Sequence, residues 1–139
     1  MIYKLMRLLA QWLLFFVGIT ALYGGSKLLS DPSGQALGLP EEYLEELPFG
    51  SFFIPGMALF VIIGVSSLLV CLSVAAHVRY YGWYVAAQGL VLAGWVLVQL
   101  ILLGSFVPVL HTPYFSIAMV LMVVGFWLQQ AEKKRNLIL

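Results

Sequence analysis

The residues with the clearest capacity for chemistry are five acids between two long apolar stretches: Asp31, Glu41, Glu42, Glu45 and Glu46. Carboxylates gathered in this way could bind a divalent cation or a basic partner surface, or they could simply be solvated by water and salt. A calcium loop needs oxygen ligands at alternate positions around a glycine, and this segment lacks that pattern. The sequence therefore favours solvation first, a basic partner second and a metal ion last.

A second polar set lies within the third apolar stretch. Gln88, Trp95 and Gln99 occupy positions i, i+7 and i+11, so at about 100° per residue they share one stripe of a helix. Amides at such positions usually face the bundle and bond to a neighbouring helix. The alternative interpretation is that the stripe contacts a bound ligand.

The groups that usually catalyse reactions are missing elsewhere in the chain. No Asp, Glu, Lys or Arg falls in the middle of an apolar stretch, where proton-coupled transporters bury an ionisable side chain. Cys71 is the single cysteine, which excludes an internal disulfide and cysteine-pair redox chemistry. The sequence has no glycine-rich phosphate loop, and its net charge of +1 indicates no nucleic-acid partner. We expect a protein that is not an enzyme and that holds no cofactor or metal.

Composition determines the environment of these residues. Of 139 residues, 63% are hydrophobic and 9% are charged, and the mean hydropathy is +1.02. A soluble chain of this length could not hide so much apolar surface. About 20 helical residues cross a bilayer, and four stretches are long enough, at about 5–29, 55–78, 83–106 and 113–128. We expect one all-α domain, an integral membrane four-helix bundle in the lipid bilayer, with Thr112-Pro113 starting its last helix.

Charges beside the four spans predict the orientation. Six cations and Glu132 lie on one side of the membrane: Lys4, Arg7, Arg79, Lys133, Lys134 and Arg135. That side has a net charge of +5, whereas the five acids and Lys27 give the opposite side −4. Because basic flanking residues stay in the cytoplasm, both termini are expected to be cytoplasmic and the acidic loop, residues 30–54, extracytoplasmic.

Local signals divide this outer loop. DPSG at residues 31–34 has type I turn preferences, with the Asp31 carboxylate bonding the backbone two residues on. A short amphipathic helix should follow Pro40, on the membrane surface or over the bundle mouth, with the glutamates on its polar face. Its apolar face would carry Tyr43, Leu44 and Leu47. The PG pair at residues 55–56 either occupies the first turn of the second span or breaks that span.

Four segments of the chain form a pattern: DPSGQALGLP, LPFGSFFIPGMALFVIIG, GWVLVQ and TPYF. Together they resemble a family of small bacterial four-span membrane proteins of uncharacterised activity, over about residues 18–125. The D-P-S-G…P-F…I-P-G loop is the most specific part of this resemblance. It implies a bacterial inner-membrane location and a fixed outer loop. Helix count and glycine spacing are also similar to those of DoxX-like proteins.

Two functions from different classes follow. The first is a non-enzymatic binding or assembly module that presents the acidic extracytoplasmic loop, as a homo-oligomer or beside a larger membrane-protein partner. The alternative is a carrier or binder of a lipid, quinone or other apolar small molecule. Its site would lie between the helices near Gln88, Trp95 and Gln99, beneath the acidic loop.

Overall fold

The computed structural model describes residues 1–48, 50–104 and 107–138, and every regular element among them is helical. The elements are α1 (Ile2–Ser30), η1 (Gln35–Leu37), α2 (Glu42–Glu46), α3 (Phe53–Ala58), η2 (Leu59–Val65), α4 (Ser66–Ala75), α5 (Tyr81–Leu103) and α6 (Pro108–Ile138). Within the described ranges, four helices are long and apolar enough to cross a membrane: Ile2–Ser30, Phe53–Ala75, Tyr81–Leu103 and Pro108–Leu137. The predicted fold class is confirmed, and the chain is a multi-pass membrane protein.

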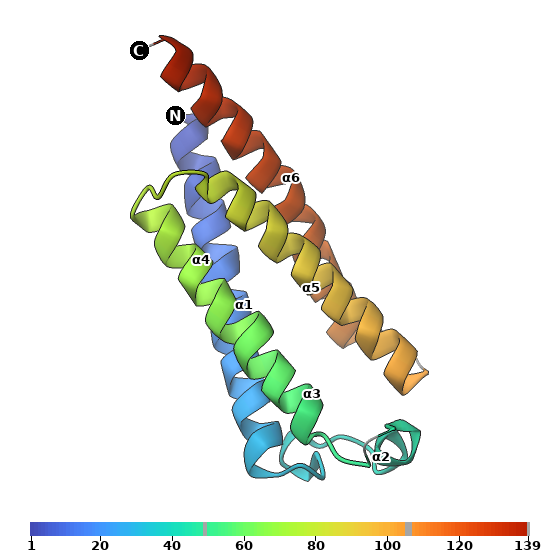
Figure 1. The fold of residues 1–139 in the computed structure, drawn as a ribbon. Coiled ribbons are helices and arrows are strands. Elements are labelled where there is room, and N and C mark those ends of the chain that lie inside the picture. The colour runs from blue at the N-terminus through green and yellow to red at the C-terminus, as the bar shows by residue number, and fades with distance from the viewer. Residues whose placement is uncertain (49, 105–106, 139) are drawn as a thin grey trace.

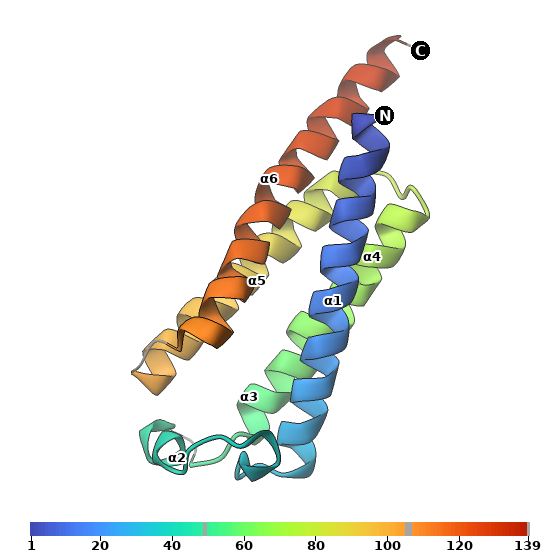
Figure 2. The same cartoon turned by 180° about the vertical axis from the view of Figure 1, so that it is seen from behind.

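The four spans pair into two hairpins (Figures 1 and 2). α1 packs along α3, η2 and α4, which form one continuous second span, and α5 packs along α6. The hairpins contact each other mainly through α1 with α6 and α4 with α5. Both termini and the α4–α5 turn lie at one end of the bundle, here called the terminal end (Figure 1). The hairpins separate toward the other end, the loop end, where η1 and α2 lie.

Glycines allow the helices of each hairpin to approach closely. A Cβ atom added to Gly125 of α6 would lie 2.4 Å from the backbone nitrogen of Ala86 in α5. One added to Gly25 of α1 would lie 2.7 Å from the Cβ of Phe60 in η2. Both distances are far inside van der Waals contact, so the two crossings as they stand accommodate only glycine.

The start of the last span differs from the sequence prediction, which is wrong here. α6 begins at Pro108 and contains Pro113, instead of beginning at Thr112-Pro113. Proline suits the first helical position because its missing N–H needs no partner there, and Pro108 provides that position five residues earlier. The helix also continues past residue 128 to Ile138, through a stretch without Gly or Pro. The predicted end of the third span falls on residues 105–106, which lie outside the described residues.

The second span continues through Pro55 and Gly56. α3 begins at Phe53, so Pro55 lies in its first turn, as the simpler of the two interpretations predicts. Gly56 lies against α1, where an added Cβ would be 2.7 Å from the Cβ of Leu28. From Leu59 to Val65 the backbone widens into a π-helix before α4 resumes the α-helical pattern. This π-helix has no counterpart among the sequence predictions.

Polar contacts from α1 connect the helices at the terminal end. The hydroxyl groups of Tyr3 and Tyr81 share a hydrogen bond, which joins α1 to α5. Arg7 donates a 2.8 Å hydrogen bond to the carbonyl of Val74 in α4. The guanidinium of Arg135 in α6 lies 4.3 Å from the ring centroid of Tyr3. The two hairpins are therefore held together where the chain begins and ends.

Candidate ligand-binding pocket

Asp31 organises the start of the loop. Its Oδ1 accepts hydrogen bonds from the hydroxyl and the N–H of Ser33, at 2.5 and 3.2 Å. Its Oδ2 accepts one from the N–H of Ala36, at 3.0 Å. These bonds, that of the Ser33 hydroxyl first, hold the pKa of the Asp31 carboxyl below its usual range. The predicted bond from Asp31 to the backbone two residues on is confirmed.

The rest of the loop folds back over the loop end of the bundle. Leu47 and Phe52 are buried, and they pack with Leu28 of α1 and Leu103 of α5 in one apolar cluster. The N–H of Phe52 donates a 2.9 Å hydrogen bond to the carbonyl of Pro32, which ties the two ends of the loop together. The described part of residues 31–52 therefore forms a cover, here called the lid.

The short helix α2 has the two faces that the sequence predicts. Tyr43 and Leu44 are half-buried and pack against the apolar cluster of the lid. The exposed side carries the four glutamates: Glu41, Glu42, Glu45 and Glu46. The amide of Gln35 donates a 3.5 Å hydrogen bond to Glu41. In the described parts of the chain, no group of three or more His, Cys, Asp or Glu side chains is arranged to hold a metal ion.

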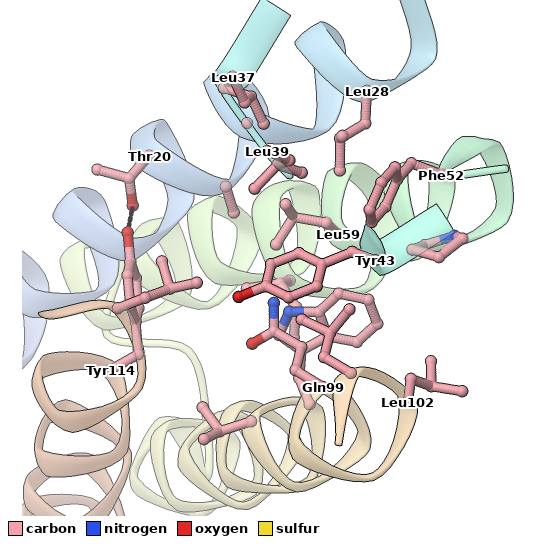
Figure 3. A pocket seen from close by; sticks show the side chains of 18 of the residues that line it. Thr20, Leu28, Leu37, Leu39, Tyr43, Phe52, Leu59, Gln99, Leu102 and Tyr114 are labelled. Carbon is pink, nitrogen blue, oxygen red and sulfur yellow. Dashed lines mark hydrogen bonds between the residues drawn. The ribbon is translucent and has the colours of Figure 1, made fainter. Parts of the chain in front are cut away.

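Beneath the lid lies a cavity of about 300 Å³ between the two hairpins (Figure 3). Helices α1, η2, α5 and α6 form its walls, which are almost entirely apolar. The lid contributes the roof, with Leu37, Leu39, Tyr43, Leu47 and Phe52. The cavity therefore occupies the space that opens where the hairpins separate.

A few polar side chains interrupt this apolar lining. The hydroxyl of Tyr114 in α6 donates a 2.8 Å hydrogen bond to the hydroxyl of Thr20 in α1 (Figure 3). The side chains of Tyr43 and Gln99 also line the cavity (Figure 3), as does that of Trp95. Within the described ranges, the side chains of Tyr43, Trp95 and Gln99 have no hydrogen-bond partner in the protein. Their polar atoms can therefore bond to a ligand.

The residues of the polar stripe predicted along the third span have two different roles. Trp95 and Gln99 line the cavity, whereas Gln88 does not. Gln88 is buried and donates a 2.9 Å hydrogen bond to the hydroxyl of Ser67 in α4. Thr20 and Tyr114 are missing from the sequence prediction, because nothing local connects two residues that belong to the first and last spans.

Comparisons of the chain with protein-family models, with curated proteins and with solved structures find no match. The cavity and its lid are therefore the features of the molecule that indicate a function.

Proposed function

We propose that this protein binds or carries one small apolar molecule in the cavity beneath the lid. The observation that carries this proposal is a cavity of about 300 Å³ with an apolar lining, between hairpins whose own helices pack closely at glycines such as Gly25 and Gly125. A cavity lined by apolar side chains excludes water and favours apolar ligands. The volume is at the small end of ligand pockets, so it suits one ring or one chain segment and not a whole phospholipid.

The polar atoms in the cavity favour a ligand with a hydrogen-bonding head. The indole N–H of Trp95 can only donate, whereas the Gln99 amide and the Tyr43 hydroxyl can donate or accept. A carbonyl oxygen on an otherwise apolar ring satisfies such donors, as in a quinone. No Asp, Glu, His, Cys, Lys or Arg is among the described residues that line the cavity. This lining favours binding and release over a chemical step.

The charge distribution supports an orientation for the site. The terminal end carries Lys4, Arg7, Arg79 and the basic residues near the C-terminus, and the loop end carries the acids. By the preference of basic residues for the cytoplasm, both termini face the cytoplasm. The resemblance of the loop to that of small bacterial four-span proteins supports a location in a bacterial inner membrane. The cavity then lies in the outer half of the bilayer, with the lid on the extracytoplasmic side.

The test is native mass spectrometry of protein released gently from its own membranes. Wild-type protein should retain one small molecule, and its mass identifies the chemical class. Ala21 lines the cavity and is 3% exposed, whereas Ile19 of the same helix is 46% exposed. Ala21→Phe should fill the cavity and remove the adduct, and Ile19→Phe should retain it. An adduct of the same mass and occupancy in both variants would exclude the cavity as the site.

The exposed acids support a second candidate function, which is assembly with a basic partner. All four glutamates of the lid point to the solvent side of α2, in a cover whose opposite side is apolar. Such a surface suits a homo-oligomer or a larger membrane protein that presents Lys or Arg beside it. The protein would then be a non-enzymatic binding or assembly module that presents its acidic loop outside the membrane.

A further inference from the structure

A second cavity, of about 470 Å³, lies at the terminal end, on the opposite side of the membrane from the lid. It is formed between the α4–α5 turn and the last turns of α6. Its lining is polar and charged, unlike that of the first cavity: Arg79, Tyr80, Trp83, Gln129, Glu132 and Lys133 contribute to it. The proposed binding of an apolar molecule beneath the lid involves no contact with these residues.

Two residues of this cavity's lining each have a side-chain oxygen that is buried without a hydrogen-bond donor in the described structure. Gln129 is only 9% exposed, and its Oε1 has no hydrogen-bond partner in the described structure. Oε2 of Glu132, one helical turn further along α6, is also buried without a partner there. Buried acceptors without a donor are unfavourable. A ligand in the cavity would relieve this cost if the amide and the carboxylate turned these oxygens toward its N–H or O–H groups.

The same cavity also presents two cations. Arg79 belongs to the α4–α5 turn, and its guanidinium lies 4.7 Å from the ring centroid of Tyr80. Tyr80 adopts a left-handed backbone conformation, with φ of 67°, at the start of α5. Lys133 approaches from α6 and is exposed. A guanidinium and an ammonium beside one cavity are the groups that proteins use to bind phosphate.

The cavity borders the surface that faces lipid. Trp83 is 47% exposed and packs edge-to-face with Phe126, which is 52% exposed, with ring centroids 5.9 Å apart. Tryptophan beside a charged cluster at the end of a membrane helix is typical of the headgroup region. A molecule held in this cavity could extend acyl chains along Trp83 and Phe126. This continuity favours a lipid over a soluble phosphate.

We infer that this cavity binds the headgroup of an aminophospholipid from the same leaflet. Arg79 and Lys133 bond the phosphate, and the primary ammonium donates to Glu132 and to Oε1 of Gln129. A choline headgroup has the same charges but no N–H groups, so it leaves both acceptors without a donor. A glycerol headgroup offers hydroxyl groups but no positive charge for the Glu132 carboxylate. The charge pattern therefore selects ethanolamine.

The experiment measures lipid retention by native mass spectrometry of the full-length protein. Phosphatidylethanolamine, phosphatidylcholine and phosphatidylglycerol with identical acyl chains are offered in equal amounts. Phosphatidylethanolamine should be retained about tenfold more strongly than either competitor. Lys133→Gln should remove this preference, whereas Lys134→Gln, next to it but outside the cavity lining, should keep it. Glu132→Gln should reduce the discrimination between ethanolamine and glycerol headgroups.

A final competition experiment distinguishes a lipid from a soluble ligand. Phosphoethanolamine without acyl chains should not displace the lipid at an equal concentration, and displacement would overturn the assignment to a lipid. Equal retention of the three lipids, preference for phosphatidylglycerol, or equal effects of Lys133→Gln and Lys134→Gln would each overturn the inference. Circular dichroism checks the fold of each variant, and Arg79→Gln replaces Lys133→Gln if the latter does not fold.

Discussion

The amide of Gln88 donates a 2.9 Å hydrogen bond to the hydroxyl of Ser67, and both side chains are buried where α5 meets α4. Gln88→Leu should therefore lower the free energy of unfolding by about 1 kcal/mol, because the Ser67 hydroxyl loses its partner inside the bundle. Thermal unfolding in detergent measures this change. A double-mutant cycle with Ser67→Ala should show coupling between the two sites. Additive effects in that cycle would contradict a structural role for the bond.

Gln99→Leu should have the opposite effects on stability and on ligand affinity to those of Gln88→Leu. Gln99 lines the cavity and has no partner to lose among the described residues, so stability should stay unchanged or rise. Affinity for a short-chain benzoquinone, titrated into protein in lipid nanodiscs, should fall about five- to tenfold with the loss of one hydrogen bond. Gln88→Leu serves as the matched control and should keep the wild-type affinity. Equal affinities in all three proteins would show that Gln99 makes no contact with the ligand.

Acid should loosen the lid at Asp31. The folded protein favours the ionised carboxylate, because the Ser33 hydroxyl and backbone N–H groups bond to it and lower its pKa. A lowered pKa contributes stability above the unfolded value near 3.8, and this contribution disappears as the pH falls through the folded pKa. Hydrogen exchange of the loop amides should therefore accelerate as the pH falls below about 4, after correction for intrinsic rates. Asp31→Asn should show faster loop exchange already at pH 7 and little further change with acid.

Two glycines of the last two spans should respond oppositely to alanine. A Cβ at Gly125 would lie 2.4 Å from the nitrogen of Ala86, so Gly125→Ala must force α5 and α6 apart. We expect a loss of about 2–3 kcal/mol in the free energy of unfolding. An added Cβ at Gly94 meets no described atom within 4 Å, so Gly94→Ala should be neutral or stabilise α5 by about 0.5–1 kcal/mol. Equal melting temperatures for the two variants would contradict the close helix crossing.

The acidic face of the lid can be tested by removing charge from Glu41, Glu42, Glu45 and Glu46. Changing all four to Gln should weaken co-purification of any basic partner, and changing them to Lys should weaken it further. The Gln variant is the control for a change in membrane topology, because it adds no positive charge to the loop. Since the carboxylates are exposed, both variants should keep the wild-type melting temperature. Undiminished co-purification of the same partner in both variants would exclude assembly through this face.

Several features of the fold follow from patterns within the sequence. Long apolar stretches predict the four spans, because crossing a bilayer requires about 20 apolar helical residues. The turn at Asp31 and the two faces of α2 follow from local hydrogen bonding and from helical periodicity. The start of α6 does not, because Pro108 and Pro113 both suit a first turn and only tertiary packing selects between them.

The sequence predicts the cavity less well than it predicts the lid. Periodicity places Trp95 and Gln99 on the inner side of α5, but it gives Gln88 the same stripe although Gln88 bonds to Ser67. The Tyr114–Thr20 bond joins residues of the last and first spans, and neither residue carries a local signal for the other. The separation of the hairpins that creates the cavity is a property of their packing. No single span encodes it.

The π-helix of the second span makes the number of residues in that span important for the orientation of its side chains. Leu59 and Ile63 line the cavity within this segment, and Ser67, the second residue after it, bonds to Gln88. Over the seven residues from Leu59 to Val65, the wider turns shift the helical phase by about one residue, or about 100°. Deleting one residue here would restore an ordinary α-helix and rotate the cavity wall relative to Ser67. We therefore expect insertions and deletions in this segment to be far more disruptive than exchanges among its apolar side chains.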